Sequence, residues 1–191
     1  TTVGSAACPL ATPCAALDYS QDFETGGTSM VATTNSGSSI TVDATGANAS
    51  LYGAHMQGNT SSYWYSPYNT GANAFSSSPN HIAQISREIC AATKPNVTLT
   101  FDKKQTYTYN ITYSWFRVTI DGLPIADVNG DTYFNGSNSS WTTMTYDLSL
   151  FAGSDFVLAF ETCNKYYTGY TSTGLGGDAS YIDNISIVQT A

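Results

Sequence analysis

Short segments of alternating apolar and polar residues most strongly constrain how this chain folds. The clearest is NVTLTFD at residues 96–102, where Val97, Leu99 and Phe101 alternate with polar residues. A period of two places these apolar side chains on one face of a β-strand. Further segments also read as strands, and one of them, residues 81–89, fits a short helix as well. These further segments are residues 29–34, 39–44, 50–57, 81–89, 110–122, 141–149, 155–163 and 179–189.

Turn signals separate the predicted strands, and no segment of ten or more residues has a clear helical period. Asn, Ser and Gly follow residues 29–34, and an Asp-Gly pair at 121–122 ends residues 110–122. Charged residues make up only 10% of the chain, and the abundant Thr and Tyr suit a pleated, half-buried surface. The sequence therefore predicts an all-β fold, an antiparallel two-sheet β-sandwich of the jelly-roll type.

The length and the ends of the chain predict the domain organisation. A chain of 191 residues fits one domain, and we assign residues 21–191 to a single jelly-roll domain. Residues 1–20 are small, irregular and contain proline, which is typical of an N-terminal extension or linker. We expect a disulfide to hold this extension in place.

The charge balance and the missing motifs exclude several classes of function. Lys and Arg number 6 against 14 Asp and Glu, giving a net charge of −8, which argues against nucleic acid or an anionic membrane as partner. No stretch of 18 apolar residues is present, so we expect no membrane insertion. No nucleophile motif or phosphate-binding loop occurs, and 14 acids would supply some carboxylate pair by chance. We expect a protein that is not an enzyme.

Four cysteines, Cys8, Cys14, Cys90 and Cys163, favour an extracellular disulfide protein, because their number is even and no zinc spacing is present. Three pairings are possible. We favour Cys8–Cys14, which closes a short loop, and Cys90–Cys163. Cys90 precedes one strong strand and Cys163 ends another, so a bond between them would tie two strands together. The alternative is that these residues are buried free thiols.

Two long segments, residues 58–80 and 164–178, are rich in aromatic residues and lack a strand pattern. Loops of this length are usually functional or disordered. If exposed, the flat apolar faces and polar edges of these rings suit sugars and also suit protein interfaces. The alternative is that the rings pack the two loops onto the sandwich. The candidate ligand-binding residues are Tyr63, Trp64, Tyr65, Tyr68, Tyr166, Tyr167 and Tyr170.

Three motifs together resemble a known group of domains. They are DFETGG at residues 22–27, WTTMTYDLSLFAGSDFVLAF at 141–160 and GDASYIDNISI at 177–187. The chain over about residues 20–189 resembles MAM-like and carbohydrate-binding-module-like jelly-roll domains of bacterial cell-surface and secreted adhesins. The resemblance implies a β-sandwich of two antiparallel sheets that binds glycans or proteins and does not catalyse. The cysteine arrangement and the two long aromatic segments depart from the MAM pattern.

The resemblance also implies a structural calcium ion that joins the two ends of the domain. By this likeness, Glu24 and Asp183 are its ligands. Ca²⁺ takes six to eight oxygen ligands, and a partly buried carboxylate needs a compensating partner. The alternative is that Asp183 caps a turn or faces solvent and that Glu24 is a surface residue. A second acidic segment, DVNGD at residues 127–131, lacks the later Gly and Glu of a calcium loop, and we interpret it as an Asn-Gly turn.

The sequence therefore predicts an extracellular or cell-surface module for adhesion or structure. We expect it to contact protein partners, or copies of itself, in a surface fibre (filament) or a multidomain adhesin. The alternative is a carbohydrate-binding module that uses exposed aromatic loops. Seven Asn-x-Ser/Thr triplets are compatible with glycosylation of a secreted protein, but a chain rich in Asn, Ser and Thr contains such triplets by chance.

Overall fold

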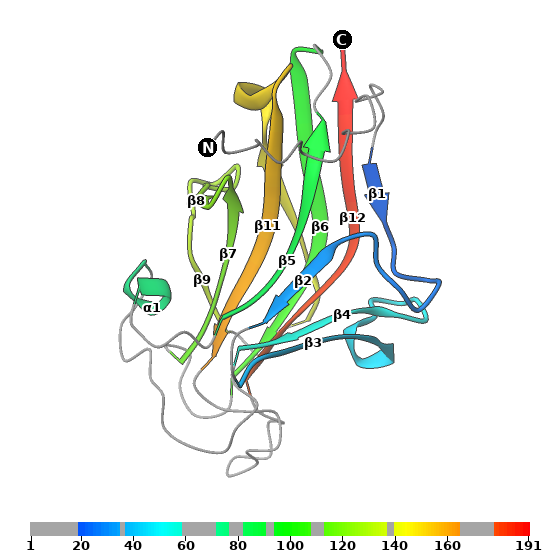
Figure 1. The fold of residues 1–191 in the computed structure, drawn as a ribbon, viewed down its shortest axis with the longest axis vertical. Coiled ribbons are helices and arrows are strands. Elements are labelled where there is room, and N and C mark those ends of the chain that lie inside the picture. Colours follow the sequence, from blue (N-terminus) through cyan, green and yellow to red (C-terminus); the bar gives the residue numbers. More distant parts are fainter. Residues whose placement is uncertain are drawn as a thin grey trace, which may run out of the picture.

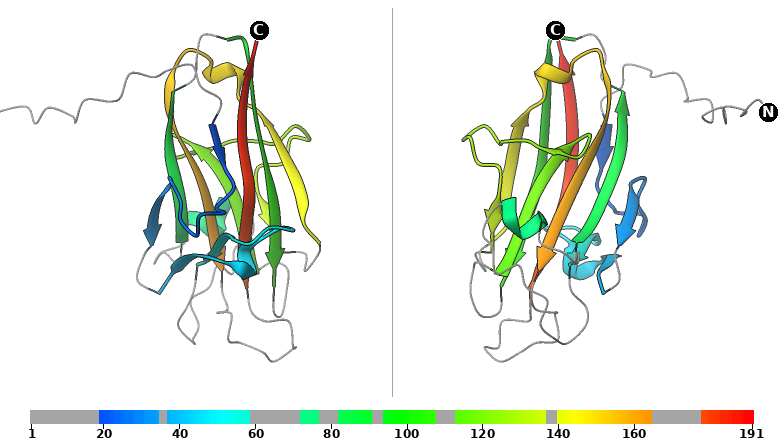
Figure 2. Two further views of the ribbon diagram at one scale, coloured as in Figure 1. Left: turned by 90° about the vertical axis from the view of Figure 1, so that its right-hand side faces the viewer. Right: turned by 60° about the vertical axis from the view of Figure 1, so that its left-hand side comes forward.

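The structure of the protein is a computed structural model in which two antiparallel sheets pack face to face (Figures 1 and 2). It describes residues 19–34, 37–58, 72–76, 82–90, 94–107, 113–136, 140–164 and 178–191. Strands that follow one another in sequence often lie in different sheets, as in a jelly roll. The predicted all-β class and two-sheet sandwich are confirmed.

The sheets are here named A and B. Sheet A contains, in spatial order, β10 (Thr142–Asp147), β6 (Asn96–Thr106), β12 (Ala179–Thr190), β4 (Gly53–Gln57) and β3 (Ser39–Asp43), with β1 (Tyr19–Gln21) paired to β12. Sheet B contains β2 (Val31–Thr34), β5 (Ile82–Cys90), β11 (Asp155–Asn164), β7 (Ser114–Ile120) and β8 (Leu123–Pro124), with β9 (Phe134–Asn135) paired to β7. The helical pieces are short: α1 (Ala72–Ser76) and the 3-10 helices η1 (Ala44–Gly46) and η3 (Ser149–Phe151). The described part of the chain contains no helix with the length and hydropathy of a membrane span.

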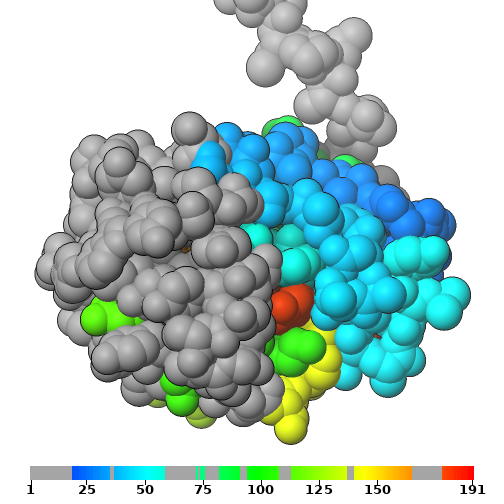
Figure 3. Space-filling view, turned by 90° about the horizontal axis from the view of Figure 1, so that it is seen from below, coloured from blue at the N-terminus to red at the C-terminus, as the bar shows by residue number. Residues whose placement is uncertain are grey.

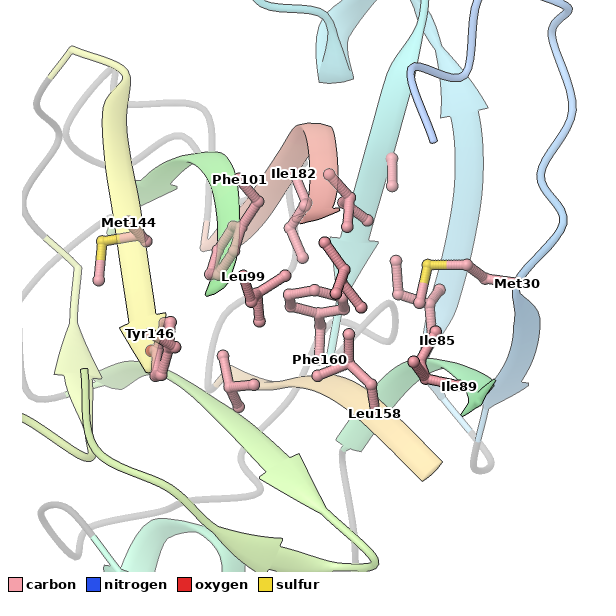
Figure 4. Packing of buried hydrophobic residues seen from close by; sticks show 14 of the residues in the cluster. Met30, Ile85, Ile89, Leu99, Phe101, Met144, Tyr146, Leu158, Phe160 and Ile182 are labelled. Atoms are coloured by element: carbon pink, nitrogen blue, oxygen red, sulfur yellow. The ribbon is translucent and has the colours of Figure 1, made fainter. Parts of the chain in front are cut away.

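The core lies between the sheets and follows from the alternating pattern. Val97, Leu99 and Phe101 of β6 are each at most 1% exposed and point toward sheet B. The ring of Phe101 meets Phe160 of β11 edge-on, with 4.8 Å between centroids. Burying aromatic and aliphatic side chains in this way is the main source of stability in such a sandwich. Figure 4 shows side chains from both sheets meeting in this layer, among them Met30, Ile85, Ile89, Leu99, Phe101, Met144, Tyr146, Leu158, Phe160 and Ile182.

Every predicted strand segment contains a strand. Residues 81–89, which also fitted a helix, form β5, a strand that pairs on both sides with β2 and β11. The Asp-Gly pair makes the expected tight turn, because Asp121 and Gly122 both have positive φ, 50° and 77°. Tyr19 and Ser20, placed in the predicted N-terminal extension, belong to β1 and pair with β12. Residues 1–18 lie outside the described part of the chain.

The predicted Cys90–Cys163 disulfide is wrong. Cys163 is a free, buried thiol. In the β5–β11 ladder, Cys90 lies opposite Asp155 and Cys163 lies opposite Ile82, so the two cysteines are at opposite ends. That separation is about 26 Å at a rise of about 3.3 Å per residue, whereas a disulfide requires Cα atoms within about 7 Å. The other predicted disulfide, Cys8–Cys14, lies outside the described residues.

Candidate functional site

Four side chains form a row across the outer face of sheet A, here named the sheet A row. In the ladder, Tyr181 of β12 lies opposite both Lys104 of β6 and His55 of β4. Trp141 immediately precedes β10 and continues the row beyond Lys104. Directly opposite residues share one face of a sheet, so the row crosses four strands in register. Figure 3 shows the corresponding cyan, orange-red, green and yellow parts of the chain meeting on one side of the molecule.

The members of the sheet A row stack on one another. The rings of His55 and Tyr181 lie 4.8 Å apart at 23°. Lys104 Nζ lies 4.5 Å from the centroid of Tyr181 and 5.1 Å from that of Trp141. Because β12 lies between β4 and β6, His55 and Lys104 cover opposite faces of Tyr181. Trp141 lies at the end of the row, beside the edge strand, and is the ring that can offer a face to a ligand.

Charge and protonation in the row are set by partial burial. Burial lowers the pKa of Lys104, and it lowers the pKa of His55 although the nearby Asp43 acts in the opposite direction. His55 is therefore neutral at pH 7, and its 3.5 Å contact with Asp43 is not an ion pair there. Burial acts to raise the pKa of Asp43, but hydrogen bonds from Thr41 and Thr45 outweigh it and lower the pKa to about 2. Asp43 therefore carries a negative charge beside His55, at one end of the row.

A second carboxylate, Asp102, lies two residues before Lys104 on β6 and therefore on the same face of the sheet. Its Oδ2 accepts hydrogen bonds from the amides of Asn48 and Asn184, both at 2.9 Å, and its Oδ1 accepts one from Thr143 at 2.6 Å. Burial acts to raise the pKa of Asp102, and these hydrogen bonds lower it overall. Asn184 reaches this position because a β-bulge in β12 gives it a left-handed conformation, φ 51°.

The segment 44–52 lies against this side of sheet A because two glycines allow it. A Cβ atom on Gly53 of β4 would lie 1.9 Å from the carbonyl oxygen of Gly46 in η1, and one on Gly46 would lie 2.3 Å from the carbonyl oxygen of Gly53. No other residue fits at either position without backbone movement. The contact holds Asn48 beside Asp102 of β6, to which it donates its hydrogen bond.

The predicted metal ligands, Glu24 and Asp183, both bind the segment 48–52. Asp183 is 0% exposed and accepts hydrogen bonds from Asn48 N at 2.8 Å, Ser50 Oγ at 2.7 Å and the backbone N–H of residue 184 at 2.8 Å. Glu24 accepts from the backbone N–H groups of residues 51 and 52 at 3.1–3.2 Å. The alternative in which Asp183 faces solvent is therefore wrong. No described group of three or more His, Cys, Asp or Glu side chains is arranged to hold a metal, and the calcium ion stays a prediction.

The outer face of sheet B carries a second polar row, formed by Gln84, Glu161 and Arg117, and the ring of Phe75 from α1 packs over Arg117. Glu161 of β11 lies opposite Gln84 and Arg117, and its carboxylate binds both, at 2.7 Å and 2.6 Å. Helix α1 lies on this outer side (Figure 2), and the ring of Phe75 is 4.3 Å from the guanidinium carbon of Arg117. An apolar cluster of Ala74, Phe75, Trp115 and Cys163 joins α1 to the sheet.

The predicted aromatic ligand residues all lie outside the described part of the chain; they are Tyr63, Trp64, Tyr65, Tyr68, Tyr166, Tyr167 and Tyr170. The strand ends that flank these segments are adjacent, because Met56 of β4 lies opposite Ser180 of β12. The sheet A row begins one residue from each of these positions. Sequence reasoning missed the row, since alternation places Lys104 and Tyr181 outward but does not give the register that pairs them.

Comparison with known proteins supports the fold. No family model matches the chain, and no curated protein matches it. The K1 cleaved adhesin domain of Lys-gingipain from Porphyromonas gingivalis W83 superposes with a TM-score of 0.56 at 13% identity, over 92% of this chain and 99% of that one. TmCBM61, solved with β-1,4-galactotriose, gives 0.53 at 10% identity, over 88% and 94%. The CBM22-1 xylan-binding domain of Paenibacillus barcinonensis Xyn10C gives 0.50 at 17% identity, over 91% and 94%.

At these identities the likeness shows the fold alone. It confirms the part of the sequence resemblance that pointed to carbohydrate-binding-module-like and adhesin jelly rolls. The MAM part of the resemblance stays a prediction.

Proposed function

We propose that the protein is an extracellular glycan-binding module that holds its ligand on the sheet A row. One observation carries the proposal. An aromatic and cationic row stands in register on a partly exposed sheet face, with the carboxylates of Asp43 and Asp102 beside it. Because its members stack on one another before any ligand arrives, little side-chain entropy is lost on binding.

Each group in the row matches part of a sugar. The indole of Trp141 packs against the C–H face of a pyranose ring, as aromatic rings do in sugar sites. The ammonium of Lys104 donates hydrogen bonds to hydroxyl or ring oxygens. The carboxylates of Asp102 and Asp43 accept hydrogen bonds from hydroxyl groups. None of these steps breaks a bond, and the proposal assigns the protein no catalytic activity.

The comparisons support a glycan in preference to a protein ligand. Two of the similar structures are named for binding xylan or were solved with a galactotriose.

A second candidate is the adhesive or structural module that contacts proteins or further copies of this chain. The likeness to a gingipain adhesin domain favours it. Aromatic and Lys side chains with polar edges also suit protein interfaces. Under this candidate, the row would bury against a protein surface, and soluble sugars would not compete.

We propose further that Glu24 and Asp183 hold a structural calcium ion at the segment 48–52. Their carboxylates, the Ser50 hydroxyl and the backbone carbonyl of residue 52 provide the oxygen ligands that Ca²⁺ prefers. Such an ion would fasten the segment that positions Asn48. It would take no part in ligand recognition.

Affinity electrophoresis tests the proposed function directly. Wild-type protein is run in gels that contain xylan, galactan or another single polysaccharide, beside the variants Trp141→Ala and Tyr52→Ala. Tyr52 is an exposed aromatic residue outside the row, so its variant is the matched control. We expect at least one polysaccharide to retard the wild type and Tyr52→Ala but not Trp141→Ala. Binding to proteins with no retardation by any polysaccharide would favour the adhesive candidate.

A further inference from the structure

The edge of sheet B is open along the second half of β5. On one side, β11 pairs with β5 over residues 82–90, whereas on the other side β2 pairs only with residues 83–86. Strand β5 therefore continues past the part that β2 covers (Figure 1). An exposed strand edge offers backbone groups to any extended chain that reaches it, and proteins usually cover such edges.

The backbone of Glu88 faces this open edge. Val157 of β11 lies directly opposite Glu88, and its own backbone groups point away from β5: its N–H donates to the Asp121 carboxylate at 2.9 Å, and its carbonyl oxygen accepts from the backbone N–H of Asp121 at 2.9 Å. In an antiparallel ladder, directly opposite residues exchange both backbone hydrogen bonds or neither. The N–H and C=O of Glu88 are thus directed away from β11, where none of the described strands pairs with them.

A groove of about 460 Å³ lies beside this edge. Its apolar lining comes from Val31 and Val157, whose side chains are 63% and 42% exposed. A short uncharged segment would cover these side chains. The lining includes Ser29, Val31, Arg87, Glu88, Cys90 and Val157.

The cysteines identify which segment of the chain reaches the groove. Cys90 is disulfide-bonded, whereas Cys163 is a free thiol. The chain has two other cysteines, Cys8 and Cys14, so one of these is the partner of Cys90. Either bond brings the N-terminal extension to the end of β5 and replaces the predicted Cys8–Cys14 bond.

The described chain begins beside the groove. The ring of Tyr19 lies 5.6 Å from the guanidinium carbon of Arg87, and its hydroxyl lies 2.9 Å from Ser29 Oγ. Tyr19 itself pairs with β12 in sheet A, so a segment that joins it to the groove crosses from one sheet to the other. Facing sheets lie about 10 Å apart, a distance that three residues of extended chain span.

This spacing favours Cys14 as the partner. Counted back from Tyr19, the crossing brings residue 16 to the edge of sheet B. If residue 16 lies opposite Glu88 and the segment runs antiparallel to β5, Cys14 is level with Cys90. Cys8 would close a longer loop, which costs more entropy.

We propose that residues 14–16 add a short antiparallel strand to the open edge of β5, opposite residues 88–90, and that a Cys14–Cys90 disulfide fastens it. The backbone N–H and C=O of Glu88 bond to residue 16, whose alanine side chain lies in the groove. The occupant is the N-terminal extension of the same chain, and it closes an edge at which a second copy could add a strand. This surface belongs to sheet B and is independent of the sheet A row.

Disulfide mapping tests the bond. The oxidised 191-residue chain is unfolded in urea with iodoacetamide and without reductant, digested with chymotrypsin and analysed by mass spectrometry. We expect one pair of linked peptides, joining Cys14 to Cys90, and alkylated Cys8 and Cys163. A bond from Cys8 to either Cys14 or Cys90, or an alkylated Cys90, would overturn the proposal. So would a disulfide-linked dimer on a non-reducing gel, because it would place the segment on a second copy.

Amide hydrogen exchange, followed by NMR, tests the added strand. We expect the Glu88 amide to exchange at least about tenfold more slowly in the wild type and in the matched control Cys8→Ser than in Cys14→Ser, because the bond to residue 16 protects it. The amide of Leu99, in the core strand β6, should stay protected in all three proteins, which shows that each is folded.

Two results of the exchange experiment would contradict the proposal. An unprotected Glu88 amide in the wild type would overturn the added strand, whether or not Cys14→Ser folds. Equal exchange of this amide in Cys14→Ser and Cys8→Ser would overturn the role of the disulfide. Because both experiments are made without a ligand, their failure would leave the proposed function intact.

Discussion

Replacing Asp183 with alanine should strongly destabilise the protein. The carboxylate is fully buried and accepts three hydrogen bonds, at 2.7, 2.8 and 2.8 Å. A hydrogen bond to a charged group contributes about 1.5–3 kcal/mol, and donors left buried without a partner cost free energy as well. Using the low end for each bond gives a loss of about 4–5 kcal/mol in the free energy of unfolding. For a domain of this size, that loss lowers Tm by roughly 10–15 °C.

Differential scanning calorimetry of wild type, Asp183→Ala and Asp131→Ala measures this effect. The side chain of Asp131 is exposed, and its variant is expected to unfold within about 2 °C of wild type. Circular dichroism below the transition confirms that each variant is folded. A Tm for Asp183→Ala equally close to wild type would refute the argument that Asp183 anchors the segment 48–52.

Three further predictions concern other groups. If calcium is held at Glu24 and Asp183, EDTA lowers the Tm of wild type but not that of Asp183→Ala, because a ligand that binds the native state stabilises it by mass action. An equal change in Tm of the two proteins on adding EDTA would count against these two residues as ligands. Burial lowers the pKa of Lys103 to about 8, so between pH 8 and 10 the unfolded chain binds more protons and stability rises with pH. The difference in urea unfolding free energy between wild type and Lys103→Met should change by about 2 kcal/mol from pH 7.5 to 9.5 in favour of wild type, and a difference independent of pH contradicts the shift. Burial raises the pKa of the Cys163 thiol to about 12, so alkylation at pH 8 should be far slower in the native protein than in urea, and rapid native labelling would disprove it.

The sequence predicts the strands of this fold well, because alternation has a direct physical cause. In NVTLTFD, each apolar residue becomes a core residue of β6, and the Asp-Gly pair becomes a tight turn. The strands that were missed, β1, β8 and β9, are two or three residues long and too short to show a period. Helix α1 was missed because five residues give no helical repeat.

The alternation of apolar and polar residues does not predict which strands pair or in which register. Cys90 and Cys163 both lie on predicted strands, but only the register of β5 and β11 shows that they are at opposite ends. The same applies to Tyr181, Lys104 and His55, which become neighbours only once β12 is placed between β6 and β4. The prediction that Glu24 and Asp183 meet rested on a family resemblance. In the structure, both carboxylates accept hydrogen bonds from backbone N–H groups of the segment 48–52. No sequence motif identified these donors.

The measurement that tests the central claim most directly is an NMR titration of the ¹⁵N-labelled protein with the oligosaccharide of whichever polysaccharide retards it in gels. If the sheet A row holds the glycan, the largest shifts occur at the indole N–H of Trp141 and at the backbone amides of Lys104, Tyr181 and His55. The Trp141→Ala variant then shows no saturable shifts at these positions. Saturable shifts confined to other surfaces, with the row unchanged, would contradict the account.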